Sequence, residues 1–452
     1  MASRQRIKTL RAGTAAVVIT PPVGTAMEGY SAREGGSQGV HDDLHARALV
    51  VDDGSTAIAI VSCDLVGVDW RLVAEARDRA AQATGIAPDH ILVAATHTHA
   101  GPAGLRRELD ESLLDVTARH IAGAIAAAHA ARRPVVLKVG EGQVDSVSQN
   151  RRQPDWPIDP SLYVLLFDDP DPLQPPIAAL INFACHPTVL YHTNMLLSAD
   201  YVGHAVRTVE KLFPGLGGVF INGACGNVNP AWIAQEHAEA ERVGTIVGAA
   251  AARLIGELRP LGPGQRADNI RWSEHIELPV TAGQLIDDVE LRVASRRVEL
   301  PMKSYLDPAE YESSLRELQA RVDALDPAAV AERRSLMAQV TRLRTERGVA
   351  ARMAELGRLT LRPEFMAISF SPELTLLGLP GEFFVETVAE IRENAGLRYL
   401  PVACYANHYI GYVVPAAAYD EGGYEAGVTL LGPPAEGIAK QEALAILGEL
   451  AR

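Results

Sequence analysis

Potential metal ligands stand in four short segments that long stretches of chain separate. Residues 96–102 carry two histidines, residues 183–187 carry one, residues 380–383 carry a glutamate, and residues 412–424 carry tyrosines. Imidazole nitrogens and carboxylate oxygens that converge from separate segments are the donors of catalytic zinc sites, in which one position stays open for water or substrate. The residue types therefore indicate a metal-dependent hydrolase.

The first three of these segments each follow an apolar run typical of a β-strand. The runs are residues 91–94, 178–183 and 374–379. Residues just beyond strand C-termini, ahead of Gly or Pro turns, occupy the positions where α/β proteins place their chemistry. We therefore expect the ligands to meet at the ends of a sheet.

Each candidate ligand also has a structural alternative. His97 and His99 would point the same way in an extended chain, and His99 is open to three roles: ligand, substrate contact or proton transfer. Pro187 holds His186 extended, and a buried histidine with satisfied hydrogen bonds is its alternative. We expect Glu382 to begin a helix, where a carboxylate would also suit the helix dipole.

The same segments resemble the neutral ceramidase family of zinc amidases, which hydrolyse the amide bond of N-acylsphingosine. The resemblance is an ordered series of motifs and covers nearly the whole chain. It runs through Gly29-Tyr30 and residues 97–102, 149–151, 183–187, 226–230, 380–383, 412–414 and 424–426.

The resemblance implies a Zn²⁺ site and a substrate site. The implied zinc ligands are His97, His186, Glu382 and Tyr419. The implied substrate site contains His99, Asn150, Arg151 and Tyr412. Tyrosinate is a rare donor because the phenol has a pKa near 10, but a zinc ion supplies the required shift electrostatically. An arginine beside a metal can also clamp a carboxylate, although a surface arginine is the plain alternative.

Three departures separate this chain from the family pattern. Asn229 stands where the family has its proposed serine nucleophile, and an amide nitrogen is no such nucleophile. Leu431 replaces the tyrosine that stabilises the oxyanion. We also expect no counterpart of the family's C-terminal β-sandwich domain in this sequence. Together these departures favour a different substrate.

A catalytic role without covalent attack is open to Asn229. Its NH₂ group can donate to the substrate carbonyl or to the developing oxyanion. His99 or Asp64 would take or relay the proton. Asp64 follows the apolar run 58–63 and could instead orient a ligand histidine or cap a turn.

Composition limits the partners. The net charge of −14 argues against nucleic acid and against anionic membranes, both of which attract Lys and Arg. Aromatic residues make up only 5% of the chain, which favours a small, polar substrate over a two-chain lipid. No Pro/Gly/Ser linker divides residues 1–452, so we expect a single domain.

The cysteines and the N-terminus favour a cytoplasmic protein. The four cysteines are isolated from one another, and three of them lie in apolar runs, so we expect buried thiols. The apolar run 15–19 is too short for a signal peptide, and no stretch approaches 18 apolar residues.

Strand and helix patterns alternate along the chain and predict an α/β fold with mixed sheets covered by helices. Residues 46–51 and 57–61 read as a β-hairpin. Residues 304–358 break the alternation and predict an inserted helical hairpin, with helices at 310–324, 328–344 and 350–358. It would serve as a lid or as an arm for a homo-oligomer, or would simply pack on its own domain.

The sequence therefore predicts a zinc-dependent hydrolase that cleaves an amide or cyclic amide bond of a small, polar substrate. A lactone or ester hydrolase, a zinc-dependent lyase or isomerase, and a zinc-binding protein without activity are the alternatives.

Overall fold

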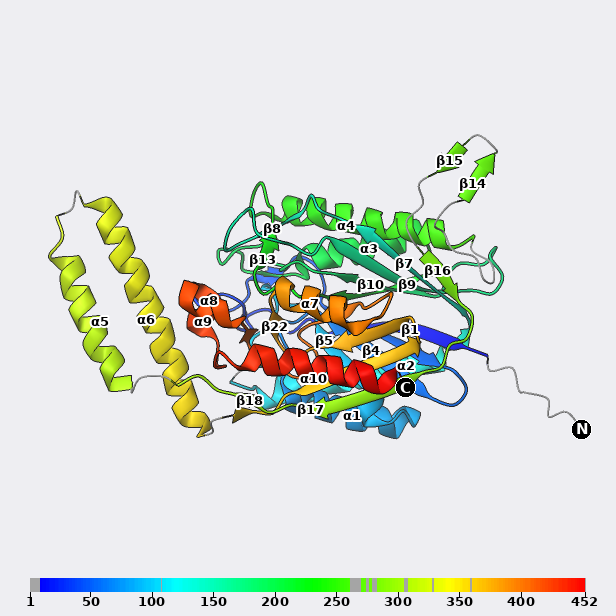
Figure 1. Ribbon diagram of the computed structural model, residues 1–452, viewed down its shortest axis with the longest axis horizontal. Helices are drawn as coiled ribbons and strands as arrows, with labels where there is room; N and C mark the ends of the chain where they lie inside the picture. Colours follow the sequence, from blue (N-terminus) through cyan, green and yellow to red (C-terminus); the bar gives the residue numbers. More distant parts are fainter. Residues whose placement is uncertain are drawn as a thin grey trace, which may run out of the picture.

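The computed structural model of the chain describes residues 9–106, 108–260, 270–273, 276–278, 283–304, 308–326, 329–357 and 360–451. Residues 1–8 and residues 305–307, 327–328 and 358 of the predicted hairpin insertion lie outside the described residues. The elements are arranged in layers (Figure 1).

Two five-stranded mixed sheets form the centre of the molecule. The first has the order β5 (Ile91–Ala95), β4 (Ala57–Cys63), β3 (His45–Asp52), β1 (Arg11–Val18) and β6 (Arg133–Pro134). The second has the order β12 (Gly217–Asn222), β10 (Ala178–Phe183), β9 (Ser161–Asp168), β7 (Val136–Gln143) and β16 (Gly283–Ile286). The expected hairpin is the antiparallel pair β3–β4.

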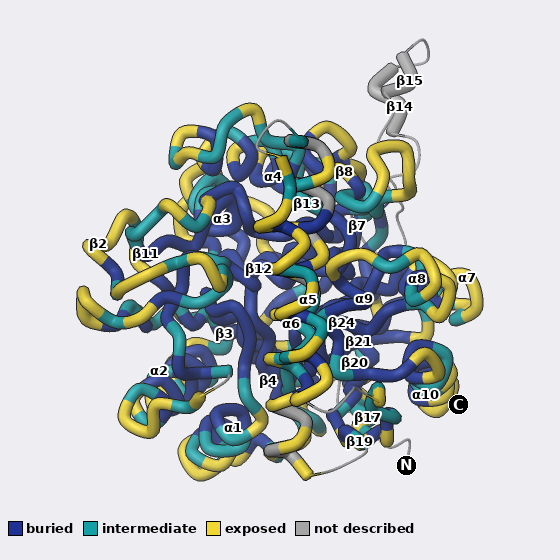
Figure 2. Tube along the Cα trace, turned by 90° about the vertical axis from the view of Figure 1, so that its left-hand side faces the viewer, coloured by how far each residue is buried: buried dark blue, intermediate teal, exposed yellow. Residues whose placement is uncertain are grey.

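The two sheets share a buried apolar core. Leu49 and Ile60 from the first sheet pack in one cluster with Leu165 and Leu180 from the second. Because the outer faces of both sheets are also covered by helices, their central strands are buried on both sides and read as continuous apolar runs (Figure 2).

Helices α1 (Trp70–Thr84) and α2 (Glu111–Ala130) cover the first sheet, and α3 (Asp200–Leu212) and α4 (His237–Leu258) cover the second. Small residues on α4 allow it to approach α3 closely, since a Cβ at Gly244 would lie 2.3 Å from the Tyr201 carbonyl oxygen. The predicted α/β class with mixed sheets is confirmed.

A third sheet completes the body. Its order is β17 (Arg292–Arg297), β20 (Glu364–Ser371), β21 (Leu374–Gly378) and β23 (Val402–Ala403). Helix α10 (Ala435–Leu450) packs on this sheet and also contacts α7 (Val385–Ala395). Strand pairs β4–β5, β10–β12 and β21–β23 are parallel. The C-terminal ends of the two strands in each pair therefore lie at the same edge of the sheet.

The inserted helical hairpin is confirmed as α5 (Pro308–Asp323) and α6 (Val330–Leu356), which project from the body (Figure 1). The last two predicted helices are one continuous helix. Leu315, Val322, Leu336 and Val340 form a small core of the hairpin's own. The insertion leaves and rejoins the body at the antiparallel pair β18 (Leu300–Pro301) and β19 (Thr360–Leu361).

The remaining elements are short. They are β2 (Gly39–Val40), η1 (Pro88–His90), β8 (Ser148–Asn150), β11 (Leu196–Leu197), β13 (Val228–Pro230), β14 (Ile270–Ser273), β15 (Ile276–Leu278), β22 (Glu382–Phe383), β24 (Tyr412–Val413), α8 (Ala416–Glu421) and α9 (Tyr424–Val428). All four cysteines are buried and unpaired, as predicted. Within the described ranges, no helix has the length and apolarity to cross a bilayer.

Candidate metal centre and adjoining pocket

His97 leaves strand β5 through a left-handed backbone conformation, with φ of 72°. Its main-chain N–H donates to the Leu65 carbonyl at 2.9 Å, and its ring stacks on Tyr405 with centroids 4.1 Å apart. Its Nδ1 lies 2.5 Å from the Val66 carbonyl oxygen. His97 is therefore not extended, because the loop after β4 fixes both its main chain and its ring.

His186 follows β10 and is fully buried. Its Nδ1 lies 2.5 Å from the Cys225 carbonyl oxygen, and its main-chain N–H donates to Val228 at 3.2 Å. The segment after β12 thus orients this imidazole, as the loop after β4 orients His97.

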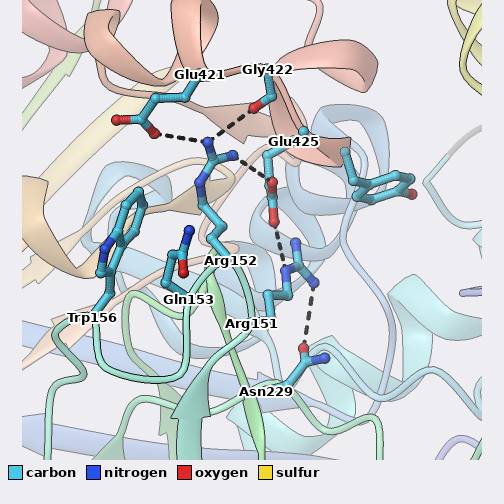
Figure 3. A pocket seen from close by; sticks show the side chains of 10 residues that line it. Arg151, Arg152, Gln153, Trp156, Asn229, Glu421, Gly422 and Glu425 are labelled. Atoms are coloured by element: carbon cyan, nitrogen blue, oxygen red, sulfur yellow. Dashed lines mark hydrogen bonds and ion pairs between the residues drawn. The ribbon is translucent and has the colours of Figure 1, made fainter. Parts of the chain in front are cut away.

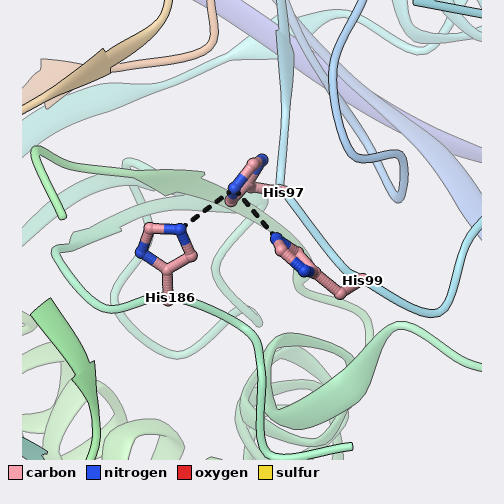
Figure 4. A group of neighbouring side chains, drawn as sticks. All are labelled: His97, His99 and His186. Atoms are coloured by element: carbon pink, nitrogen blue, oxygen red, sulfur yellow. Dashed lines mark hydrogen bonds between the residues drawn. The ribbon is translucent and has the colours of Figure 1, made fainter. Parts of the chain in front are cut away.

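Three imidazoles converge at this point (Figure 4). The Nε2 atom of His97 lies 3.2 Å from Nε2 of His186 and 3.1 Å from Nε2 of His99. An Oε2 atom of Glu382 approaches the same place, 3.1 Å from Nε2 of His186 and 3.4 Å from Nε2 of His97. Four donors from three distant segments therefore meet.

Glu382 reaches the cluster from a strand and not from a helix start. Its main-chain N–H donates to Gly411 at 2.9 Å, and β22 pairs in parallel with β24 so that Glu382 lies opposite Tyr412. Helix α7 begins only at Val385. The expected helical position of Glu382 was wrong, because the main-chain pairing with residues 412–413 holds it extended.

Burial sets the protonation of these groups. It lowers the pKa of His186 to about 4. Burial, together with His97 and His186, holds the pKa of His99 well below its usual range. Burial alone would raise the pKa of Glu382, but attraction to His97 and His186 outweighs it and lowers that pKa well below normal. Burial thus favours neutral imidazoles at His99 and His186 beside an ionised Glu382.

These residues fit a metal ion. A carbonyl oxygen only accepts, so Nδ1 of His97 and Nδ1 of His186 carry the protons, and their Nε2 atoms are left as lone-pair donors. Within the described part of the chain, the buried Glu382 Oε2 has no hydrogen-bond donor. Lone pairs that face one another across about 3 Å are repulsive unless a cation lies between them, and imidazole and carboxylate donors suit zinc.

A cavity of about 780 Å³ adjoins the centre. Its lining includes Asn229 and Glu425 together with Arg151, Arg152 and Trp156 (Figure 3). Two links join it to the centre. Val228, whose carbonyl accepts from the main-chain N–H of His186, precedes Asn229 in β13. Tyr412, which pairs with Glu382, accepts a hydrogen bond from the cavity residue Arg151.

Arg151 connects the predicted pocket residues. Its Nε donates to Glu425 at 2.7 Å, its Nη1 to Oδ1 of Asn229 at 3.4 Å, and its Nη2 to the Tyr412 hydroxyl at 3.0 Å. A guanidinium only donates, so the oxygen of Asn229 must face Arg151 and its NH₂ group is directed elsewhere. Arg151, Asn229 and Tyr412 are therefore brought together.

Asp64 and Asn150 both contact main-chain groups. The Asp64 carboxylate accepts from the His45 N–H at 2.9 Å, and burial raises its pKa to about 6; the orienting contact to His97 comes from Val66. Asn150 donates to Pro157 at 2.9 Å and accepts from the Arg152 N–H at 3.0 Å. Asn150 thus shapes the loop that carries the arginines.

Tyr419 has a different neighbour from the one that the resemblance implies. Its hydroxyl donates to the Leu431 carbonyl at 2.8 Å, and burial raises its pKa to about 12. Among the described residues, no hydrogen bond or ring contact joins it to the three histidines. Its role as a ligand stays a prediction.

Sequence reasoning did not find Tyr409. Its hydroxyl donates to Oε1 of Glu382. The Arg106 guanidinium lies 4.4 Å from its ring centroid and pairs with Glu28. The only signal in the sequence is a tyrosine three residues before Tyr412, which does not identify its partner.

Comparison with known proteins gives consistent matches. Residues 11–230 match the model of the neutral/alkaline non-lysosomal ceramidase N-terminal family. The neutral ceramidase of Pseudomonas aeruginosa is 25% identical over 90% of this chain and 67% of its own length. That of Drosophila melanogaster is 28% identical over 49% of this chain, which spans 36% of that enzyme.

Solved structures agree on the fold. A crystal structure of the P. aeruginosa neutral ceramidase superposes with a TM-score of 0.71 at 22% identity, covering 98% of this chain and 74% of the other. A ceramidase complexed with C2 gives a TM-score of 0.72 at 21% identity, with coverage of 98% and 75%.

Proposed function

This chain belongs to the neutral/alkaline ceramidase family, and from that premise we propose that it is a zinc-dependent hydrolase of a small, polar amide. The family relationship indicates a hydrolase that acts on an amide bond. The metal, the substrate and the role of each residue are our proposal.

The observation that carries the proposal is the convergence of Nε2 of His97, Nε2 of His186 and Oε2 of Glu382. These three residues would hold the zinc ion, with His99 as the next donor within reach. Zinc, when bound, supplies Lewis acidity toward a carbonyl oxygen and makes water acidic enough to ionise near neutral pH.

Residues around the centre would stabilise the developing negative charge and transfer the proton. Arg151 holds the Asn229 amide with its oxygen turned away, so the NH₂ group is free to donate to a carbonyl as negative charge develops on it. His99 stays neutral because its pKa is depressed. Its buried Nδ1 has no hydrogen-bond partner among the described residues. A neutral imidazole has one lone pair, so His99 would serve either as a further zinc donor through Nε2 or as a weak proton acceptor through Nδ1, and not as both.

The adjoining cavity supports a polar substrate. Charged and amide side chains line it, including Arg151, Arg152 and Glu425. The relatives are named for ceramide, which is a lipid. The departures at Asn229 and Leu431 and the charged lining support our proposal that this chain acts on a smaller and more polar amide.

Metal analysis and single variants test the proposal. We expect about one zinc per chain, and loss of both zinc and amidase activity in His97→Ala and in His186→Ala, because each removes a donor. His129 lies in the last turn of α2. The His129→Ala variant is the matched control and should keep both its zinc and its amidase activity. Stoichiometric zinc in a His97→Ala/His186→Ala double variant would contradict the proposed centre.

Product analysis separates the reaction classes. Hydrolysis incorporates one solvent oxygen into the acid product, so single turnover in ¹⁸O water should label it, whereas a lyase or isomerase leaves no such label. Small N-acyl amines and the matching O-acyl esters, compared with long-chain ceramide, test the substrate. Turnover of ceramide faster than of every small amide would overturn the substrate proposal while leaving the metal centre in place.

A further inference from the structure

Arg152 lines the cavity but contributes to none of the steps above. Its side chain is 9% exposed. Nη1 donates to Glu425 at 3.0 Å, and Nη2 donates to Glu421 and to the Gly422 carbonyl, each at 2.9 Å. Its Nε–H is buried and has no acceptor within the described residues.

The unpaired Nε–H is unusual for a buried charged donor. Leaving such a group without an acceptor is energetically costly, and native proteins contain few of them. By contrast, all three nitrogens of the neighbouring Arg151 have acceptors. Arg152 therefore lacks one acceptor at the wall of a cavity that is proposed to receive a substrate.

The main chain at Gly423 lies close to the guanidinium of Arg152. Gly423 has a φ of 98°, and a Cβ there would lie 2.8 Å from Nη1 of Arg152. On its other side the guanidinium lies 5.9 Å from the Trp156 ring centroid. Trp156 is 37% exposed and forms an aromatic wall beside the free donor (Figure 3).

The two glutamates that hold Arg152 differ in exposure. The Glu425 side chain is 4% exposed and bridges both arginines, whereas the Glu421 side chain is 44% exposed and contacts one nitrogen of Arg152. Glu421 is thus the partner that an incoming anion can displace. Once Glu421 moves away, Nη2 and the unpaired Nε present one edge of the guanidinium, the geometry that binds a carboxylate through two parallel hydrogen bonds.

We infer that the Arg152 end of this cavity binds a carboxylate of the substrate, so that the preferred substrates are N-acyl amino acids or similar amides that carry an acid group. The inference rests on the proposed amidase function and names its substrate class. Asn229, at the end of the cavity next to the metal centre, would face the scissile carbonyl while Arg152 holds the acid group.

Matched ligands test the inference by binding alone. N-acetyl-L-phenylalanine and N-acetyl-2-phenylethylamine differ only in the carboxylate. Calorimetric titration of the zinc-loaded protein should show that the acid binds about 10–100-fold more tightly, the range expected for a charged hydrogen-bonded pair. Equal affinity for the two compounds, or no binding of the acid, would overturn the inference.

Two variants should move the affinity in opposite directions. Arg152→Gln removes the charged donor and should abolish the preference for the acid. Glu421→Gln removes the competing carboxylate and should tighten binding of the acid severalfold, since it frees Arg152 at an exposed position with little effect on folding. Arg71→Gln, an exposed arginine paired with Glu111, is the control that should change nothing.

The same variants also test whether the cavity binds a cationic amine in place of a carboxylate. If the cavity bound an amine through Glu421 and the aromatic wall, Glu421→Gln would weaken binding, and N-acetyl-1,4-diaminobutane would bind better than the acid. Either result overturns the inference. Because these measurements need no turnover, tight binding of the acid without hydrolysis would instead count against the amidase function.

Discussion

Two main-chain carbonyls determine how His97 and His186 present their nitrogens. Metal-binding histidines commonly donate their second N–H to a carboxylate or a carbonyl, which fixes the tautomer. Here the acceptors are Val66 and Cys225. Since no side-chain substitution removes a carbonyl, this arrangement depends on the path of the loops after β4 and β12 and not on the identity of the residues in them.

At Asn229 we expect substitution to slow the reaction without releasing the metal. Asn229→Ala should lower kcat by about 100–1,000-fold, the effect of losing one oxyanion donor, while zinc content stays at the wild-type level. Asn229→Asp keeps an oxygen for Arg151 but lacks the NH₂ group, so it should be impaired to a similar degree. Steady-state kinetics and metal analysis measure both.

Asn229→Ser provides the complementary result. A serine at this position restores the family's residue type. If this variant forms a trappable acyl-enzyme, a single substitution is sufficient to give nucleophilic attack by the serine. Full activity of Asn229→Ala would mean that Asn229 only shapes the cavity wall.

The tyrosines at 409 and 419 give a matched pair. Tyr409→Phe removes the hydroxyl that donates to Glu382 and should weaken zinc binding by about 10–100-fold, as the loss of a partner of a metal ligand does. Tyr419→Phe removes only the bond to the Leu431 carbonyl and should leave zinc affinity unchanged. Competition with a chelator measures both constants. The reverse outcome would establish Tyr419 as the ligand that the family resemblance implies.

At the scale of elements, the helical hairpin is separable from the body. It has its own apolar cluster, and the chain enters and leaves it through the paired strands β18 and β19, so a short turn can close the gap. Helix α6 contacts α9, which carries Tyr424 and Glu425 of the cavity wall. The hairpin therefore supports one side of the cavity.

Excision of residues 305–358 with a short Gly-Ser turn should leave a folded protein with full zinc content. Because α9 loses a neighbour, we expect KM for the amide substrate to rise more than kcat falls. Circular dichroism, metal analysis and kinetics on the excised chain check this. Loss of the folded state would mean that the hairpin belongs to the main core, and light scattering before and after excision decides whether it is a dimerisation arm.

At the scale of the whole molecule, packing the helices on the sheets also buries an ionisable side chain, that of Asp200. Asp200 opens α3 with a φ of 55° and accepts from the N–H groups of Leu190 and Tyr201 at 2.9 and 2.6 Å. Burial outweighs these bonds and raises its pKa to about 7. An aspartate in an unfolded chain titrates near 4.

The consequence for stability has a definite sign. Since the folded pKa is raised, the stability that protonated Asp200 contributes is fully present below about pH 4 and is lost as the pH rises through about 7. Asp200→Asn does not ionise. The free energy of unfolding of the wild type, relative to this variant, should therefore fall between pH 4 and pH 8, by on the order of 4 kcal/mol at most.

Urea unfolding of the wild type and of Asp200→Asn across this range, at a fixed zinc concentration, gives the difference directly. Zinc affinity changes with pH in both proteins alike and cancels. A difference that is flat with pH, or that grows in favour of the wild type as the pH rises, would show that Asp200 is ionised throughout.

The sequence by itself determined the elements and most of the donors. Strands buried on both faces need continuous apolar runs, so β5, β10 and β21 were visible, and the polar residues just beyond them marked His97, His186 and Glu382. The inserted hairpin was visible for a similar reason, because its leucines repeat at helical spacing. These features are local, since each depends on a window of a few turns or strands.

Only the tertiary structure decided how those residues are used. The left-handed turn at His97, the strand at Glu382 and the partners of Tyr409 and Arg152 depend on segments that lie from 27 to 273 residues apart in the sequence and pack against one another. The sequence names these residues, but it does not show which carbonyl groups their side chains contact or which cavity they line. Backbone acceptors are chemically identical at every position, so only the folded path of the chain selects which of them orient a ligand and which donor is left free.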